Sequence, residues 1–245
     1  GGSDALNYQG AVIWHYAANA EVHASVSDRA RFPVIFELYS TRFGTATPNP
    51  TLGPERATNV ELGWKGRAGA RVHLEGAVFY SDVRDLIQTV VLADATTQTQ
   101  NVGTGEFYGA EASVDVTVGT TLRFGGNYTY LHRAITDALQ PNLRPTGAPT
   151  HKAFAQVVWT PVPRLSIVPS LDSAGDRWSD VNPAPAFPYV RTGAYTLVNL
   201  SGELRLPGGV EIMVGGRNLL DDNYELAWGF PQAGRSFFVK TRIGF

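Results

Sequence analysis

The chain of 245 residues contains no cysteine, which excludes disulfides, thiolate metal sites and cysteine nucleophiles. Charged residues are scarce, at 17% with a net charge of -2, so there is no basic field for nucleic acid and none is expected as a partner. The longest apolar runs, such as 11–14 and 90–93, fall far short of the roughly 18 residues with which a helix spans a bilayer. If this chain crosses a membrane, it must cross with strands.

Enzyme motifs are missing as well. The sequence has no H-E-x-x-H, no G-x-S-x-G and no phosphate-binding loop, and Gly103-x-Gly105 does not continue into a dinucleotide fingerprint. The sequence therefore predicts no enzyme, no cofactor and no metal site. Residues 1–7 show no signal-peptide pattern and are expected to form a linker or leader, with 8–245 as one domain.

What the sequence does contain is a period of two, which is typical of strands with one apolar and one polar face. In 70–83, for example, one face carries Val72, Leu74, Val78 and Tyr80, and the other Arg71, His73 and Glu75. Eleven segments of this kind are predicted, at 8–17, 20–30, 55–65, 70–83, 104–117, 121–131, 151–160, 163–172, 193–206, 209–217 and 235–245.

The connections between these segments alternate between short turns and long links. The long links are predicted at 31–54, 84–103, 132–150, 173–192 and 218–234. Short periplasmic turns and long extracellular loops are typical of a transmembrane barrel. The predicted fold is therefore an all-β, antiparallel up-and-down transmembrane barrel of about 10–12 strands. An odd count would make the first and last strands parallel on closure, so ten or twelve are expected if the chain closes by itself.

Aromatic residues lie near both ends of the predicted strands. Trp14, Trp64 and Trp159 fall toward the short turns, whereas Tyr80 and Tyr128 fall toward the long links. Aromatic rings favour both membrane interfaces, so these residues predict two girdles. The opposite, polar faces then line a wet lumen.

Several motifs resemble the carboxy-terminal barrel of TonB-dependent receptors, in the right order and over most of the chain. The most specific is Pro48 to Glu55, similar to N-P-x-L-x-P-E, which leads into a strand carrying Glu61. A second is Asn101-Val102-Gly103 followed by Tyr108-Gly109-Ala110-Glu111, and a third is the ending from Gly216 to Phe245. The motif residues are Asn49, Pro50, Pro54, Glu55, Glu61, Gly109, Glu111, Asn218, Leu219, Asp221, Tyr224 and Phe245.

The resemblance implies a bacterial outer-membrane barrel that transports a scarce nutrient, such as a siderophore–metal chelate or a corrinoid. It implies contact with outer-membrane lipid and lipopolysaccharide, and with the barrel-assembly machinery through the last strand, which ends at Phe245. Family barrels have about 22 strands and a plug domain that contacts TonB, and neither the plug nor that many strands is found here. TonB is therefore expected as a partner only through a plug domain absent from this chain.

Ligand contacts are expected on the long loops and the upper lumen. Arginine and aromatic side chains suit an anionic or aromatic chelate, through charge-assisted hydrogen bonds and stacking. The candidate residues are His132, Arg133, Arg177, Trp178, Tyr189, Arg191, Trp228 and Phe230. The alternative is that these are ordinary loop residues exposed to solvent and bind no ligand.

Two other interpretations remain open at this point. One is a small closed or engineered barrel with a lumen filled by side chains and only a structural or weak pore role. The other is a soluble β-sandwich.

Extraction separates the membrane and soluble interpretations. A barrel bathed in hydrocarbon should leave the membrane fraction only with detergent, because its apolar strand faces have no other partner. Monodisperse protein in plain buffer, measured by size-exclusion chromatography, would contradict the membrane assignment.

Overall fold

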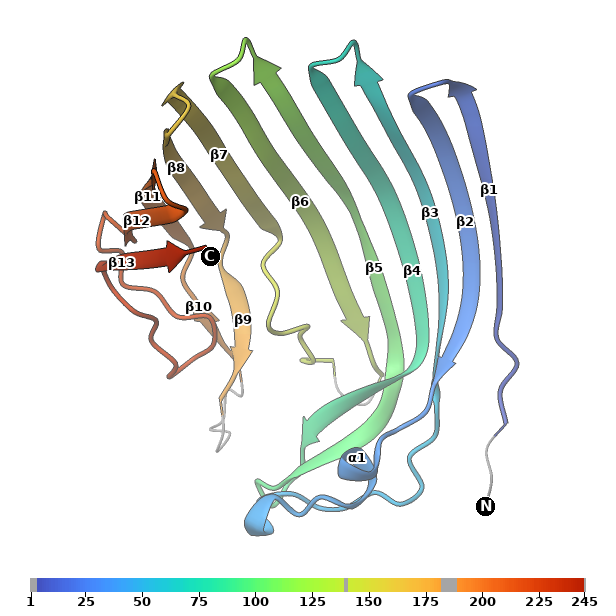
Figure 1. Ribbon diagram of the computed structural model, residues 1–245. Helices are drawn as coiled ribbons and strands as arrows, with labels where there is room; N and C mark the ends of the chain where they lie inside the picture. The colour runs from blue at the N-terminus through green and yellow to red at the C-terminus, as the bar shows by residue number, and fades with distance from the viewer. Residues whose placement is uncertain (1–3, 139–140, 182–188, 245) are drawn as a thin grey trace.

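The computed structural model describes residues 4–138, 141–181 and 189–244, so Phe245 and the first three residues lie outside the described residues. Figure 1 shows a curved antiparallel sheet whose strands follow one another along the chain. The strands are β1 (Tyr8–Ala17), β2 (Ala20–Arg31), β3 (Glu55–Ala68), β4 (Val72–Val91), β5 (Thr97–Val118), β6 (Leu122–Thr136), β7 (His151–Val162), β8 (Leu165–Ala174), β9 (Arg177–Asp180), β10 (Tyr189–Thr192), β11 (Tyr195–Leu206), β12 (Val210–Arg217) and β13 (Ser236–Ile243).

Eleven of these strands form one sheet, in the order β1-β2-β3-β4-β5-β6-β7-β8-β11-β12-β13. Strands β9 and β10 pair only with each other, as a separate two-stranded sheet. A short helix, α1 (Ile35–Tyr39), and a 3-10 turn, η1 (Arg42–Gly44), lie between β2 and β3. Within the described ranges, no helix has the length and apolar character needed to cross a membrane.

The cross-strand register confirms the predicted alternation of faces. Leu62 lies opposite Val78 across β3 and β4, and Val78 lies opposite Ala110 on β5, so apolar side chains share one face. Large apolar residues on this face are exposed, as a lipid-facing surface requires. The opposite face carries charged side chains such as Glu75, which contacts His73 at 2.8 Å.

The aromatic residues also reach the surface. Trp14, Trp64 and Trp159 are exposed toward the short turns, and the Trp64 indole donates a hydrogen bond to the hydroxyl of Tyr16. Tyr80 and Tyr128 are exposed toward the long loops. Both groups therefore lie where the sequence predicts interface girdles.

The predicted long link at 84–103 is wrong. Strand β4 continues to Val91 and β5 begins at Thr97, so most of this segment is a strand hairpin with a tight turn. The alternation stops at Asp85, which has a φ of 52°, and beyond it Leu86, Ile87 and Val90 are all buried. A strand covered on both faces loses the period of two, and the sequence then resembles a loop.

The predicted link at 173–192 likewise contains the β9–β10 hairpin, and the predicted link at 31–54 contains α1 and η1. The 132–150 and 218–234 links are confirmed as the long connections after β6 and β12, and all the predicted short turns are present.

Neither β1 nor β13 has a second neighbour in the described sheet. With eleven alternating antiparallel strands, these two edge strands run in the same direction. An antiparallel seam between β1 and β13 is therefore not possible, and the eleven strands of this sheet differ from the ten or twelve that were expected for self-closure. An antiparallel barrel that includes this sheet needs an odd number of further strands.

Adjacent substitutions on β5 test which face meets lipid. Val114 is exposed on the apolar face, and Ser113 points the other way. Val114→Arg places a guanidinium on the lipid-facing side, which costs about 2–4 kcal/mol at the bilayer midplane and about 0–1 kcal/mol near an interface, so it should cost more than Ser113→Arg. The measurement is folding into lipid vesicles across a urea titration, followed by gel mobility. Equal costs for the two variants would contradict the assignment of faces.

Candidate ligand-binding site in the long loops

A cavity of about 330 Å³ opens at the long-loop end, between the carboxy-terminal end of β6, residues 143–150 and strands β9 and β10. Four arginines and one carboxylate line it, so its charge is strongly positive. We call it the loop cavity. The lining residues used below are Arg133, Arg144, Arg177, Arg191, Trp178 and Asp176. Its volume lies at the lower end of the roughly 300–1,000 Å³ of small-molecule sites.

Trp178, on β9, is the aromatic residue of the loop cavity that the arginines contact. The guanidinium of Arg144 lies 4.6 Å from its ring centroid, and that of Arg191 lies 5.6 Å from a Trp178 ring centroid. Arg191 also forms an ion pair with Asp176. Each cation–π contact contributes about 0.5–1 kcal/mol at an exposed site and more when water is excluded. The stack therefore holds two cations in place while part of each remains open to the cavity.

Arg133 holds the segment 146–148 in place. Its two terminal nitrogens donate to the carbonyl oxygens of Thr146 at 3.0 Å and Ala148 at 2.8 Å. Burial lowers the pKa of Arg133, although a guanidinium remains charged at any physiological pH. The side chain is thus a structural tie that also brings positive charge to the cavity.

Arg177 is different, because it is buried but poorly partnered. Its exposed fraction is 7%, and its Nε and Nη2 atoms have no hydrogen-bond partner within the part of the chain that the structure describes. Its guanidinium carbon lies 5.3 Å from the ring centroid of Tyr195. A buried donor without a partner costs about 1–3 kcal/mol, and more when it is charged. Such a group is suited to an anion that arrives from outside.

Partial desolvation changes the acidity of two groups beside the cavity. It raises the pKa of the Asp180 carboxyl, against an opposing hydrogen bond from Thr146. It also raises the pKa of the Tyr189 phenol, against an opposing hydrogen bond that the phenol oxygen accepts from the backbone at Arg144. Both groups lie on the β9–β10 hairpin, so this hairpin is partly withdrawn from water at the cavity.

The structure brings together five of the eight predicted ligand residues: His132, Arg133, Arg177, Trp178 and Arg191 line the loop cavity. Tyr189 lies on the same hairpin, opposite Asp180. The ring of His132, however, stacks on Tyr108 with centroids 4.6 Å apart. Trp228 and Phe230 are exposed on the connection after β12 and do not line the loop cavity.

The apolar part of the cavity could not be predicted from the sequence. Leu131, Ile135 and Leu143 belong to the lining, and their apolar character alone does not distinguish them from any other strand or loop residue. No cluster of three or more His, Asp or Glu side chains that could hold a metal ion occurs in residues 4–138, 141–181 and 189–244.

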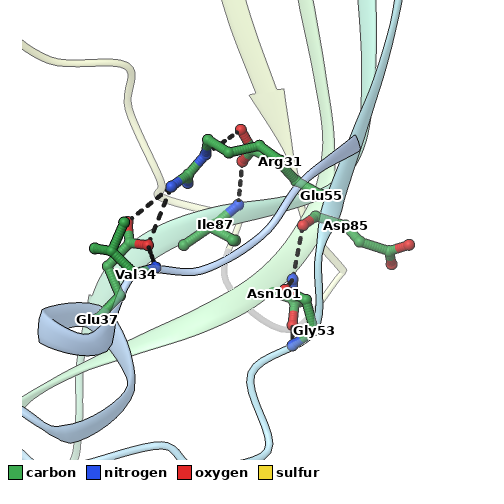
Figure 2. A network of polar contacts seen from close by, with 8 residues as sticks. All are labelled: Arg31, Val34, Glu37, Gly53, Glu55, Asp85, Ile87 and Asn101. Atoms are coloured by element: carbon green, nitrogen blue, oxygen red, sulfur yellow. Dashed lines mark hydrogen bonds and ion pairs between the residues drawn. The ribbon is translucent and has the colours of Figure 1, made fainter. Parts of the chain in front are cut away.

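The motif residues near β3 mainly hold the backbone in position. Asn49 donates its side-chain amide to the carbonyl of Thr99 at 2.9 Å, in a loop that Pro50 and Pro54 stiffen. Glu55 binds Arg31 and the backbone N–H of Ile87, as Figure 2 shows.

Along the lumen wall, Glu61 pairs with His23 at 3.0 Å, and Glu111 lines a lumen pocket with both of them. Gly109 is explained by crowding, because a Cβ there would collide with the Tyr130 carbonyl and the Phe79 ring.

The last motif builds the connection after β12. Asn218, with a φ of 51°, donates its side-chain amide to the Asp222 carbonyl at 2.8 Å, and the N–H of Leu219 bonds the carbonyl of Val198. Asp221 accepts from the N–H of Arg235 at 2.7 Å. The ring of Tyr224 lies against Tyr195, with centroids 4.6 Å apart.

The family model described as "TonB dependent receptor-like, beta-barrel" matches residues 1–219. The chain belongs to this family. TonB-dependent receptors are transport receptors of the bacterial outer membrane, so the short turns are periplasmic and the loop cavity is extracellular.

Individual relatives are distant. The chain is 24% identical to the iron-regulated outer membrane virulence protein of Vibrio cholerae over 95% of this chain and 38% of the relative. The ferric-catecholate import receptor Fiu of E. coli has a TM-score of 0.76 at 19% identity, with 98% of this chain and 35% of that one covered. The copper transporter OprC has a TM-score of 0.79 at 19% identity, with 95% and 37% covered. The chain thus spans less than half the length of these TonB-dependent receptors.

Removing the charge of Arg133 and of Arg177 should have different effects on amide exchange in the loop cavity. Arg133→Met leaves the carbonyls of Thr146 and Ala148 unpaired, so amide exchange in 141–150 should accelerate, by an amount corresponding to about 1–3 kcal/mol. Arg177→Met removes a buried, unpartnered cation and should not accelerate it. The measurement is hydrogen–deuterium exchange without ligand. Faster exchange in Arg177→Met than in Arg133→Met would contradict these roles.

Proposed function

We propose that the protein imports a siderophore–metal chelate that carries negative charge, and that the loop cavity is its recognition site on the cell exterior. The observation that carries the proposal is that Arg133, Arg144, Arg177 and Arg191 line one cavity, in which Arg144 and Arg191 lie against the ring of Trp178. Guanidinium groups bind carboxylate and catecholate oxygens through charge-assisted hydrogen bonds, and the indole ring offers a face for stacking.

The charge of the wall favours this cargo over a corrinoid. Four cations face a single lining carboxylate, that of Asp176, which is already paired with Arg191. A corrinoid carries little negative charge and would leave these cations uncompensated. The unpartnered nitrogens of Arg177 add a further demand for an anionic oxygen.

The partners follow from the same assignment. The exposed apolar residues Phe237, Val239 and Ile243 on β13 would face lipid, with lipopolysaccharide around the extracellular rim. The last strand, near Phe245, would present the signal for the barrel-assembly machinery. TonB would act only through a plug domain, which no part of this sheet resembles.

The alternative of a small closed barrel with a structural role has less support. Its antiparallel closure would need an even number of strands, whereas the described sheet has eleven and leaves β1 and β13 running in the same direction. A receptor barrel completed by further strands agrees with the coverage of the relatives, which is 38% for the curated one.

A binding titration with defined probes tests the cargo. In the full-length protein in detergent, a ferric tricatecholate should quench tryptophan fluorescence more tightly than a neutral ferric hydroxamate or cobalamin. Affinity should fall with added salt. Arg191→Ala should weaken the tricatecholate about tenfold, because it removes one charged hydrogen-bond donor.

The matched control is Arg164→Ala, an exposed arginine on the short turn between β7 and β8, which should bind as the unaltered protein does. Tightest binding of cobalamin, or tricatecholate affinity that Arg191→Ala leaves unchanged, would sink the proposed cargo.

A further inference from the structure

The β4–β5 hairpin does not end at the rim of the barrel. Both strands continue beyond β6 and bend sideways, close to α1, as Figure 1 shows at the lower end of the view. The bend coincides with Asp85, whose φ of 52° is unfavourable for a residue with a side chain. A strained bend of this kind persists only where other contacts hold it.

The first of those contacts is a carboxylate bridge. One oxygen of Glu55 accepts from Nε of Arg31 at 2.7 Å, and the other accepts from the backbone N–H of Ile87 at 2.9 Å, two residues past the bend. Arg31 in turn donates to both oxygens of Glu37 in α1, at 3.0 and 3.1 Å (Figure 2). Glu55, followed by Glu37, raises the pKa of Arg31, so the bridge is charged throughout the physiological range.

The second contact is the side chain of Asn101 on β5. Its amide donates to the carbonyl of Asp85 at 2.9 Å and to that of Gly53 at 3.0 Å, and its oxygen accepts from the N–H of Gly53 at 2.8 Å. Figure 2 shows this amide between the bend and the 45–54 segment. An amide with three bonds satisfies the strained carbonyl directly. We call Arg31, Glu37, Glu55 and Asn101 the hairpin clamp.

Beyond the clamp, the hairpin packs against the loop cavity. Val83, Leu86, Val90 and Val102 form a buried apolar cluster. Ile135 and Leu143 pack against this cluster, and both also line the loop cavity. The clamp holds the backbone at Asp85 and Ile87, on either side of Leu86, and the cluster that contains Leu86 packs against the apolar wall of the cavity. Packed cores transmit displacement because they contain little free space.

We infer that the hairpin clamp positions the apolar wall of the loop cavity: Glu55 and Asn101 fix the bent β4–β5 hairpin, and the hairpin fixes Ile135 and Leu143. The clamp touches no ligand and acts only through the hairpin. This role rests on the proposed function in so far as it affects ligand binding, but the position of the wall is a property of the ligand-free protein.

Spin-label distances measure that position without any ligand. The chain has no cysteine, so Ala93→Cys at the hairpin tip and Asn142→Cys beside Leu143 form a unique pair within it. Both positions are exposed. In the full-length protein, freed of any other cysteine, Glu55→Ala and Asn101→Ala should broaden the distance distribution of this pair. Glu55→Gln should broaden it less than Glu55→Ala, because its single amide oxygen can still accept from Ile87, although its NH2 group cannot accept from Arg31.

The matched control is Glu203→Ala, which removes another carboxylate that accepts from an arginine, Arg205, at 2.9 Å near a short turn. It should leave the loop distances unchanged. A second label pair, Ala70→Cys with Thr120→Cys on the short turns, should be unaffected by Glu55→Ala. Loop distances in Glu55→Ala that match those in Glu203→Ala would overturn the inference, and so would equal broadening of both label pairs.

Binding supplies the second readout. Glu55→Ala should weaken binding of the ferric tricatecholate about fivefold, as expected for a change that acts through neighbouring packed residues, and Glu55→Gln should weaken it less. Broadened distances with unchanged affinity would overturn the effect of the clamp on ligand binding, while its positioning of the wall would stand. If the unaltered protein does not bind the probe, the proposed function fails, while the distances still decide whether the clamp positions the wall.

Discussion

In hydrocarbon, no water can satisfy the N–H and C=O groups of a strand, so every spanning strand needs a partner on both sides. Inside the described sheet, this requirement is met by continuous antiparallel pairing from β1 to β13. The requirement also acts on the two outer strands. All ten residues of β1 are exposed, and β1 and β13 run in the same direction. An antiparallel seam that pairs both outer strands therefore needs further strands.

The membrane environment also made the spanning strands predictable from the sequence. A strand with lipid on one side and a polar lumen on the other must alternate, and a slip of one residue would place charge in hydrocarbon. Pairs such as Leu62 with Val78 and Glu75 with Ser113 follow this rule. The sequence predicted all eleven strands of the sheet and their short turns because nothing else competes with the alternation there.

Outside the membrane, water relaxes the requirement and the rule fails. Past Asp85, the hairpin buries side chains on both faces, as a soluble protein does, and its sequence no longer alternates. The loop cavity was predictable only in part. Arg133 and Arg177 were recognisable as ligand-type residues on two separate loops, but their meeting depends on tertiary packing. Ile135 and Leu143 could not be predicted as cavity residues, because the sequence does not distinguish an apolar residue that lines a cavity from one in any other packed surface.

A division of roles between side chains follows from these contacts. The motif residues Asn49, Glu55 and Asn218 form side-chain hydrogen bonds with backbone groups. They therefore fix loops and have few polar atoms available for a ligand. Arg177 keeps two nitrogens unpartnered among the described residues while it is almost fully buried. A protein tolerates such a cost only where the surrounding structure is held independently of it. The sheet and the loops held by these polar contacts supply that support. The unpartnered donors of Arg177 therefore remain available to an anion that enters the cavity.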